Sequence, residues 1–254
     1  MKSRLLSCII CIFLSGAFSV RAQSLALKAV EYERIIFEGA APAAANDAVL
    51  SRADCLVRLE RWADADACLA RLRMYALGPE QRAESAYLKT LCQYRLGNYD
   101  AALAVMNEAE FPSGREALKL KALVLAGAQQ FDEALEQATP LVSDRKALDA
   151  LFSLRPKEKS ARKALFLGII PTAGHIYLER PDLWWTTVGT VASAGLAVYE
   201  AVSGNWLTAI LGGGMLLNTI YVDNNLRPTE SIVMKYNSES LKKFLEELET
   251  ILEF

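Results

Sequence analysis

The chain has 254 residues, of which 52% are hydrophobic, and this length allows one large domain or two small ones. Its 28 basic and 30 acidic side chains give a net charge of −2, which excludes a general nucleic-acid binder because such proteins carry a strongly basic face. His175 is the only histidine, the one Cys-x-x-Cys pair (Cys8 and Cys11) lies in the apolar N-terminal run, and the sequence has no phosphate loop. We therefore expect no catalytic residue, no cofactor and no metal, in a protein that is not an enzyme.

The charged residues are distributed unevenly along the chain. Residues 24–140 hold 17 acidic and 13 basic side chains, a net of −4, whereas residues 141–163 hold three acidic and seven basic ones, a net of +4. Residues 164–222 hold one arginine and three acids in 59 positions. We expect three parts of different character: an acidic front, a basic collar and an almost uncharged block.

Residues 1–22 are typical of a signal peptide. Two basic residues precede an apolar run of 16 residues from Leu5 to Val20, which is short for a spanning helix. Val20 and Ala22 stand at the −3 and −1 positions for cleavage before Gln23. Export to the cell envelope is therefore expected, with an uncleaved N-terminal anchor as the alternative.

An N-terminal helical segment is expected over residues 23–45. Residues 25–39 have the spacing of an amphipathic helix that ends at Gly39, and Pro42 with the alanines after it predicts a loop. The apolar stripe of this helix includes Leu27, Val30 and Ile35.

One spacing occurs three times in residues 46–150. A small residue is followed nine places later by an aromatic one and three places after that by alanine. The aromatic residues lie 37 and then 32 positions apart, which is the period of a helix–turn–helix array. Helical hairpins are expected at 47–76, 83–110 and 115–142. The three sets are Ala53, Trp62 and Ala65; Thr90, Tyr99 and Ala102; and Ala122, Phe131 and Ala134.

The spacing has a steric explanation. Small residues on both helices allow the helices of one hairpin to approach closely, while the aromatic residue begins the second helix and fills the gap toward the next hairpin. No single hairpin can bury its apolar face, so stacking must stabilise the array.

These residues resemble the tetratricopeptide repeat family. The closest match is Leu96 to Leu103, with the sequence Leu-Gly-Asn-Tyr-Asp-Ala-Ala-Leu, whereas Glu60 and Gln129 occupy turns in which the family often has glycine. The resemblance implies an all-α solenoid with a groove for a protein partner. The groove residues that it implies are Asp47, Leu50, Asp54, Val57 and Arg58; Glu84, Tyr87, Leu91, Tyr94 and Arg95; and Glu116, Lys119 and Leu123.

A smaller set of these positions carries the predicted partner-binding site. Tyr87, Tyr94 and Arg95 are residue types that serve as interface anchors, although tyrosines on a helix can equally pack against their neighbours. The full predicted set is Asp54, Arg58, Glu84, Tyr87, Leu91, Tyr94, Arg95 and Lys119.

Three cysteines remain once Cys8 and Cys11 leave with the signal peptide. Cys55, Cys68 and Cys92 all fall on repeat helices, where small apolar packing is the favoured interpretation. A Cys55–Cys68 bridge across the first hairpin is the alternative.

A basic linker at 151–163 precedes predicted membrane helices at 164–225. The apolar runs are Trp184–Ser203, with 20 residues, and Trp206–Val222, with 17, and each is long enough to cross or nearly cross a bilayer core of about 30 Å. A buried hairpin of a soluble domain is the alternative. Ala164–Leu178 has 15 residues and could form a third span, a re-entrant piece or an interfacial helix.

A second resemblance covers part of this block. Pro171, Gly174 and Tyr177 match a Pro-Gly-x-Gly-x-x-Tyr motif that opens small two-helix membrane modules in bacterial families, with Thr172 in place of the first glycine. Downstream, Asn218-x-x-Tyr221 and Tyr236-Asn237 resemble the end of envelope proteins that join such repeats to this module.

Polar residues inside the apolar block suggest a second hypothesis about function. His175, Glu200 and Asn218 would lie in the membrane, where polar groups are costly and often functional. The hairpin would then be a channel, a transporter accessory or a lipid-binding element, regulated by the repeats.

Residues 226–254 are expected to end in an amphipathic helix. With three spans this end would lie in the cytoplasm, and with two it would lie outside. Our leading expectation is a scaffold held by membrane lipid at the inner membrane, with its repeats in the periplasm facing a protein partner. The apolar stripe of residues 239–254 is Leu241, Phe244, Leu245, Leu248, Ile251 and Leu252.

Overall fold

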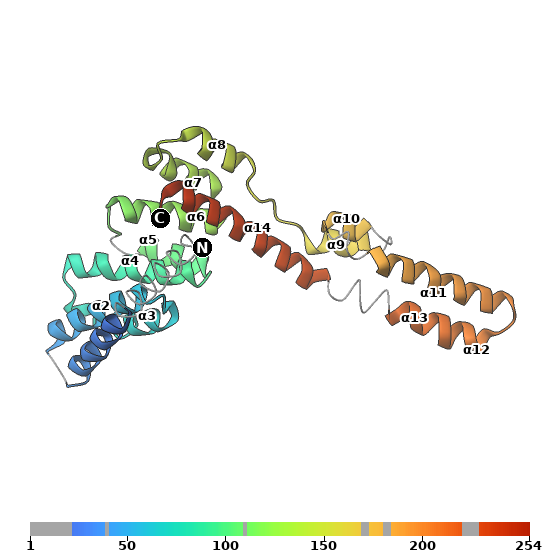
Figure 1. Ribbon diagram of the computed structural model, residues 1–254, viewed down its shortest axis with the longest axis horizontal. Coiled ribbons are helices and arrows are strands. Elements are labelled where there is room, and N and C mark those ends of the chain that lie inside the picture. The colour runs from blue at the N-terminus through green and yellow to red at the C-terminus, as the bar shows by residue number, and fades with distance from the viewer. Residues whose placement is uncertain (1–21, 39–40, 109–110, 169–172, 180–183, 220–228) are drawn as a thin grey trace, which may run out of the picture. The chain divides into compact units, whose positions relative to one another are not determined.

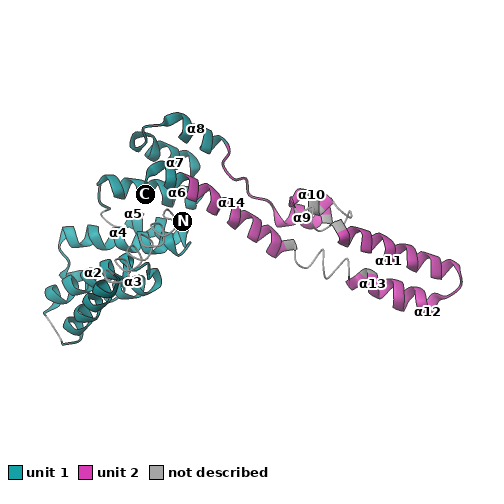
Figure 2. Ribbon diagram, viewed as in Figure 1, with its two compact units in different colours: residues 1–153, 248–254 teal, residues 154–247 magenta. Residues whose placement is uncertain are grey.

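The computed structural model describes residues 22–38, 41–108, 111–168, 173–179, 184–219 and 229–254. Within these ranges every regular element is a helix (Figure 1), which confirms the predicted all-α class. The chain divides into two compact units (Figure 2): unit 1 comprises residues 1–153 and 248–254, and unit 2 comprises residues 154–247. Nearly all of the predicted signal peptide, residues 1–21, lies outside the described residues.

The N-terminal segment of unit 1 differs from its prediction in two ways. A helix over residues 22–37 packs Ile36 against the core, but it leaves Leu27 and Val30 exposed, so the predicted stripe was wrong. Helix α2 (Pro42–Arg58) begins at Pro42, where a loop was predicted. Proline suits the first position of a helix because the amide hydrogen that it lacks would have had no partner there.

Three helical hairpins follow one another in the described part of unit 1 (Figure 1). Contacts within each hairpin, and between α3 and α4 and between α5 and α6, stack them in chain order. A short helix, α8 (Arg145–Ser153), follows the third hairpin and buries Leu148. The hairpins are α2 with α3 (Trp62–Leu69), α4 (Pro79–Arg95) with α5 (Tyr99–Glu108), and α6 (Arg115–Gly127) with α7 (Phe131–Ala138).

The repeated spacing packs as its steric explanation requires. Ala53 and Ala65 are fully buried, as are the equivalent small residues of the other two hairpins. Tyr99, the aromatic residue of the second set, lies against Gly127 at the end of α6, where an added Cβ would meet the Tyr99 ring at 2.4 Å. The aromatic residue thus fills the gap toward the next hairpin, as predicted.

The turn inside each hairpin has the same geometry even though its residues differ. The second residue after the first helix has a left-handed backbone, with φ of 57° at Glu60, 78° at Gly97 and 63° at Gln129. At each turn the next residue donates its amide to a carbonyl five positions back, as Asn98 does to Gln93. The two repeats that lack glycine therefore adopt the glycine turn, at a steric cost.

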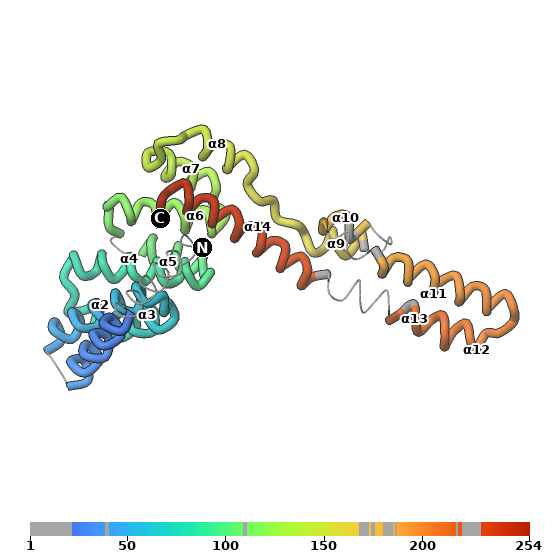
Figure 3. The backbone as a smooth tube through the Cα atoms, in the orientation of Figure 1, coloured from blue at the N-terminus to red at the C-terminus, as the bar shows by residue number. Residues whose placement is uncertain are grey.

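Unit 2 consists of short helices, a hairpin and most of a long helix. Helix α9 (Ala161–Gly168) and α10 (Ala173–Tyr177) pack together, and their small core includes Val233 of α14 (Thr229–Leu252). The hairpin pairs α11 (Trp184–Val202) with a return arm of α12 (Trp206–Thr208), the π-helical η4 (Ala209–Gly214) and α13 (Met215–Leu217). The tube in Figure 3 follows this path.

The predicted transmembrane helices are not found in the described residues. No helix there is both long enough and apolar enough to cross a membrane. Polar residues that include Thr190, Ser193 and Glu200 interrupt the apolar character of α11, and the π-helical segment divides the return arm into short pieces.

Candidate groove on the repeats and its bound tail

The last seven residues of the chain pack on the repeats. Residues 248–254, which we call the tail, belong to unit 1, although residues 229–247 of the same chain end belong to unit 2. Leu248 and Leu252 of the tail are almost fully buried. These leucines belong to the stripe predicted from sequence, whose Phe244 and Leu245 are buried too, so the amphipathic character of this helix is confirmed.

Glu249 connects the tail to α4. Its Oε1 atom accepts a 2.8 Å hydrogen bond from the Tyr94 hydroxyl and another of 2.8 Å from the Arg95 guanidinium. Burial raises the pKa of Tyr94, and the carboxylate of Glu249 raises it further. Tyr94 therefore stays protonated and donates its hydrogen bond through the neutral pH range.

The end of the tail makes two more contacts. Lys119 of α6 donates a 3.0 Å hydrogen bond to the carbonyl oxygen of Glu253 while also pairing with Glu116 at 2.8 Å. Glu253 has a left-handed backbone, with φ of 55°, and Phe254 donates its amide to the carbonyl of Glu249. This turn ends α14 and leaves the Phe254 ring 5.5 Å from the Arg95 guanidinium.

Three residues of the predicted partner-binding set thus meet the tail. Tyr94, Arg95 and Lys119 come from two consecutive repeats, and Tyr94 and Lys119 are themselves buried. We call the predicted partner-binding positions together the groove face. Sequence reasoning placed the two sides of this contact in separate parts of the chain and did not predict that they meet.

Other predicted groove residues, in the first repeat, pair with neighbouring side chains. Arg58 pairs with Asp54 at 2.8 Å, and Gln81 donates a 2.6 Å hydrogen bond to Asp47. Burial, followed by the charges of Asp54 and Asp47, raises the pKa of Glu84. The first repeats therefore give the groove face an acidic side, while Arg95 and Lys119 supply its basic side.

Several predicted positions contribute packing. Tyr87 is partly buried against the apolar core formed by α2, α3 and α4. Its ring is tilted relative to the ring of Phe111, and the two ring centroids lie 6.4 Å apart. Leu50 and Leu91 are buried, as is Leu123 of α6. These leucines hold the helices together underneath the polar contacts.

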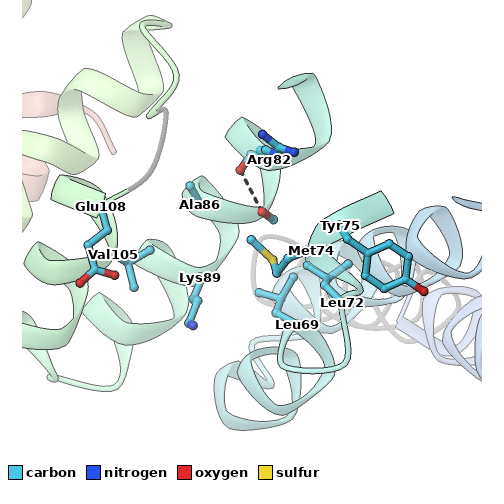
Figure 4. A pocket seen from close by; sticks show the side chains of 10 residues that line it. Leu69, Leu72, Met74, Tyr75, Arg82, Ala86, Lys89, Val105 and Glu108 are labelled. Atoms are coloured by element: carbon cyan, nitrogen blue, oxygen red, sulfur yellow. Dashed lines mark hydrogen bonds between the residues drawn. The ribbon is translucent and has the colours of Figure 1, made fainter. Parts of the chain in front are cut away.

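A pocket of about 610 Å³ lies on another face of α4 (Figure 4). Its lining combines apolar side chains with the charged Arg82, Lys89 and Glu108, and Tyr75 at its edge is 79% exposed. Arg82 and Lys89 are seven residues apart on α4, so they share one face of this helix, roughly opposite Tyr94 and Arg95. The pocket was not predicted, and the signal that sequence reasoning missed is the apolar Met74-Tyr75 pair, which lies in the short 3-10 helix η1 (Met74–Ala76) between the first two hairpins.

Cys55, Cys68 and Cys92 are free and buried. Burial raises the pKa of Cys92 to about 12 and also raises that of Cys55, so neither thiol is activated. This agrees with the packing interpretation, and no Cys55–Cys68 bridge is present. In the part of the chain that the structure describes, no group of three or more His, Cys, Asp or Glu side chains lies close enough together to hold a metal ion.

In unit 2, motif residues singled out in the sequence meet around Lys159. Its ammonium lies 3.7 Å from the centroid of the Tyr236 ring and donates a 2.8 Å hydrogen bond to Glu179. The Asn237 side chain bonds both the amide and the carbonyl of Lys159, and Tyr177 accepts a hydrogen bond from the Ser160 amide. These residues join α10 and α14 to the basic linker.

The polar residues singled out in the almost uncharged block are not brought together in the described residues. Glu200 accepts a 3.0 Å hydrogen bond from Asn205 at the tip of the hairpin. Asn218 follows α13 at the other end of the return arm, roughly 20 Å away along the helix. The side chain of His175 lies outside the described residues.

Comparison with known proteins adds no relative. No protein-family model matches the chain, and no curated protein or solved structure matches it significantly. The resemblance to tetratricopeptide repeats therefore stays a prediction. What the structure shows is a set of stacked helical hairpins in unit 1.

Proposed function

We propose that this protein is a non-enzymatic adaptor whose repeats bind a helical segment of a partner protein while its hairpin is embedded in membrane lipid. The observation that carries the proposal is the groove face itself, where Tyr94, Arg95 and Lys119 hold a helix end through polar contacts. A surface that holds one helix through side-chain hydrogen bonds over a buried apolar base has the chemistry to bind another.

The packing of the hairpin supports a lipid environment. Its inner surface is made of small residues, since an added Cβ on Gly213 would lie 2.5 Å from the Cβ of Ala197 and Ser193 is buried. Its large apolar side chains face outward, with Val202 83% exposed and Leu207 72% exposed. Water favours the opposite arrangement, whereas helices in lipid pack through small residues and turn large apolar ones outward.

The position of the tail supports one topology. Residues 248–254 belong to the same compact unit as the repeats, so both must lie on the same side of a membrane. A hairpin that enters the lipid and returns satisfies this condition, whereas three spans would not. The signal-like residues 1–22 favour the periplasmic side of the inner membrane for both.

Photo-crosslinking in intact cells tests partner binding. A photoreactive amino acid in place of Tyr87 on the groove face should give a discrete adduct with another protein, and the same residue in place of the exposed Glu136 on α7 should not. Equal labelling at both positions, or none at Tyr87 in an abundant and folded chain, would contradict the proposal.

Membrane extraction tests the role of the hairpin. The chain should stay with membranes at alkaline carbonate pH, and a variant with Val198→Ser, Leu207→Ser and Ile210→Ser should be released because these exposed side chains would face lipid. Release of the unaltered chain would count against lipid insertion.

A further inference from the structure

We propose that the tail is a displaceable ligand of its own repeats, and that the partner presents an acidic helix end of the same chemistry which takes its place. This inference rests on the proposed function and goes further in two respects: it gives the chemical class of the partner segment, and it makes occupation of the groove face a regulated step.

Charge complementarity specifies the kind of segment. The basic side chains that meet the tail, Arg95 and Lys119, contact a carboxylate and a carbonyl oxygen respectively. A helix end meets both demands at once, because its last carbonyls lack partners within the helix. An acidic side chain in the final turn supplies the carboxylate, as Glu249 does.

Apolar spacing adds a second requirement. Leu248 and Leu252 are buried and lie four residues apart, so they share one face of the helix. Phe254 follows the turn and contacts the Arg95 guanidinium. The segment is therefore expected to carry a leucine-type residue just before its acid, another three positions after it, and an aromatic residue beyond the helix end.

The nature of the contact favours exchange. The Arg95–Glu249 pair is not sealed from water, since 30% of the Arg95 side chain and 21% of the Glu249 side chain stay exposed, so solvent screens part of its attraction. Lys119 pairs with Glu116 in addition to its hydrogen bond with Glu253. Removing the tail therefore leaves no uncompensated lysine charge, and an incoming segment can restore the same bonds.

A labelled peptide of residues 241–254 tests this with the full-length chain in lipid nanodiscs. The unaltered chain should bind it weakly, because its own tail competes at high effective concentration. A Glu249→Lys chain should bind it at least tenfold more tightly, and Glu249→Gln should give an intermediate increase. Fluorescence anisotropy measures the affinity, and circular dichroism establishes that each variant is folded.

A charge swap provides the matched control. A peptide carrying Glu249→Lys should fail to bind the Glu249→Lys chain but should bind an Arg95→Glu chain, in which the new glutamate repels the chain's own Glu249 and attracts the lysine of the peptide. Equal peptide affinity for the unaltered, Glu249→Gln and Glu249→Lys chains, all folded, would overturn the inference.

The crosslink from Tyr87 separates this inference from the proposed function. In cells, Glu249→Lys should strengthen the partner adduct several-fold. An adduct of unchanged strength would support the proposed function and overturn displacement, and an adduct with a second copy of this chain would overturn the partner assignment. Peptide binding without any cellular adduct in either chain would support the displaceable tail and contradict the proposed function.

Discussion

Tyr94 and Glu249 lie 155 positions apart in the sequence and share a 2.8 Å hydrogen bond. The bond joins the second repeat to residues 248–254, which follow the almost uncharged block in the sequence. It follows that residues 248–254 complete the repeat unit, and that a substitution at Glu249 directly alters the contacts of the groove face.

The first prediction concerns the energy of this bond. In urea unfolding of the full-length chain in mild detergent, Tyr94→Phe and Glu249→Gln should each lower the free energy of unfolding by about 1 kcal/mol. Together they should lower it by less than the sum, with a coupling of about 0.5 to 1.5 kcal/mol. Strict additivity would mean that the two side chains do not interact in solution.

The second prediction concerns alkaline pH. Burial and Glu249 raise the pKa of Tyr94 above its unfolded value, so the folded chain holds its proton at pH values where the unfolded chain has lost it. This contribution is fully present below about pH 10 and is lost as the pH rises further, with a slope of up to about 1.4 kcal/mol per unit. Tyr94→Phe should reduce the slope, as measured by urea unfolding between pH 9 and 11.

Tyr75→Phe is the matched control for this measurement, because it removes a phenol hydroxyl at a position that is exposed and away from the tail. If the free energy of unfolding fell as steeply with pH in Tyr94→Phe as in Tyr75→Phe, Tyr94 would be excluded as the source of the stability lost at alkaline pH.

The third prediction concerns the repeat turns. Gly97→Ala should lower the free energy of unfolding by about 1 kcal/mol, since alanine is strained at φ of 78°. Glu60→Gly and Gln129→Gly should raise it by about 0.5 kcal/mol, because glycine relieves a left-handed strain at some cost in chain entropy. If glycine destabilised both turns, the left-handed geometry at Glu60 and Gln129 would be wrong.

The fourth prediction concerns the close approach of the hairpin helices. Gly213→Ala should lower the thermal unfolding midpoint in detergent, because the new Cβ would collide with Ala197, including its backbone. Overpacking of this kind costs about 1–3 kcal/mol. Gly195→Ala, which meets nothing within 4 Å, should be neutral or slightly stabilising. Similar midpoints for the two variants would argue against the packing of this hairpin.

Much of unit 1 could be predicted from its sequence because its signals are local. The small-residue and aromatic spacing located each hairpin, and Gly97 located a turn that Glu60 and Gln129 share without glycine. Pro42 misled the prediction because proline both breaks and begins helices, and only the residues around it decide which.

The tail contact could not be predicted because its signals are not local. The leucine stripe of α14 predicts that some surface covers it, but nothing in residues 239–254 says which one. Tyr94 and Arg95 were predicted to contact an external partner, whereas in the structure both side chains donate hydrogen bonds to Glu249. Hydropathy alone also could not reveal that the hairpin turns small residues inward, because that depends on which face of α11 meets the return arm.

One measurement tests the tail contact most directly. A photoreactive amino acid in place of the exposed Glu253, which contacts the repeats through its backbone carbonyl and leaves Glu249 unaltered, should crosslink within the purified full-length chain to α6 near Lys119, as located by mass spectrometry of the digested product. Photo-products elsewhere in the chain, or none in this region when the protein is folded, would contradict the account of the groove face and its tail.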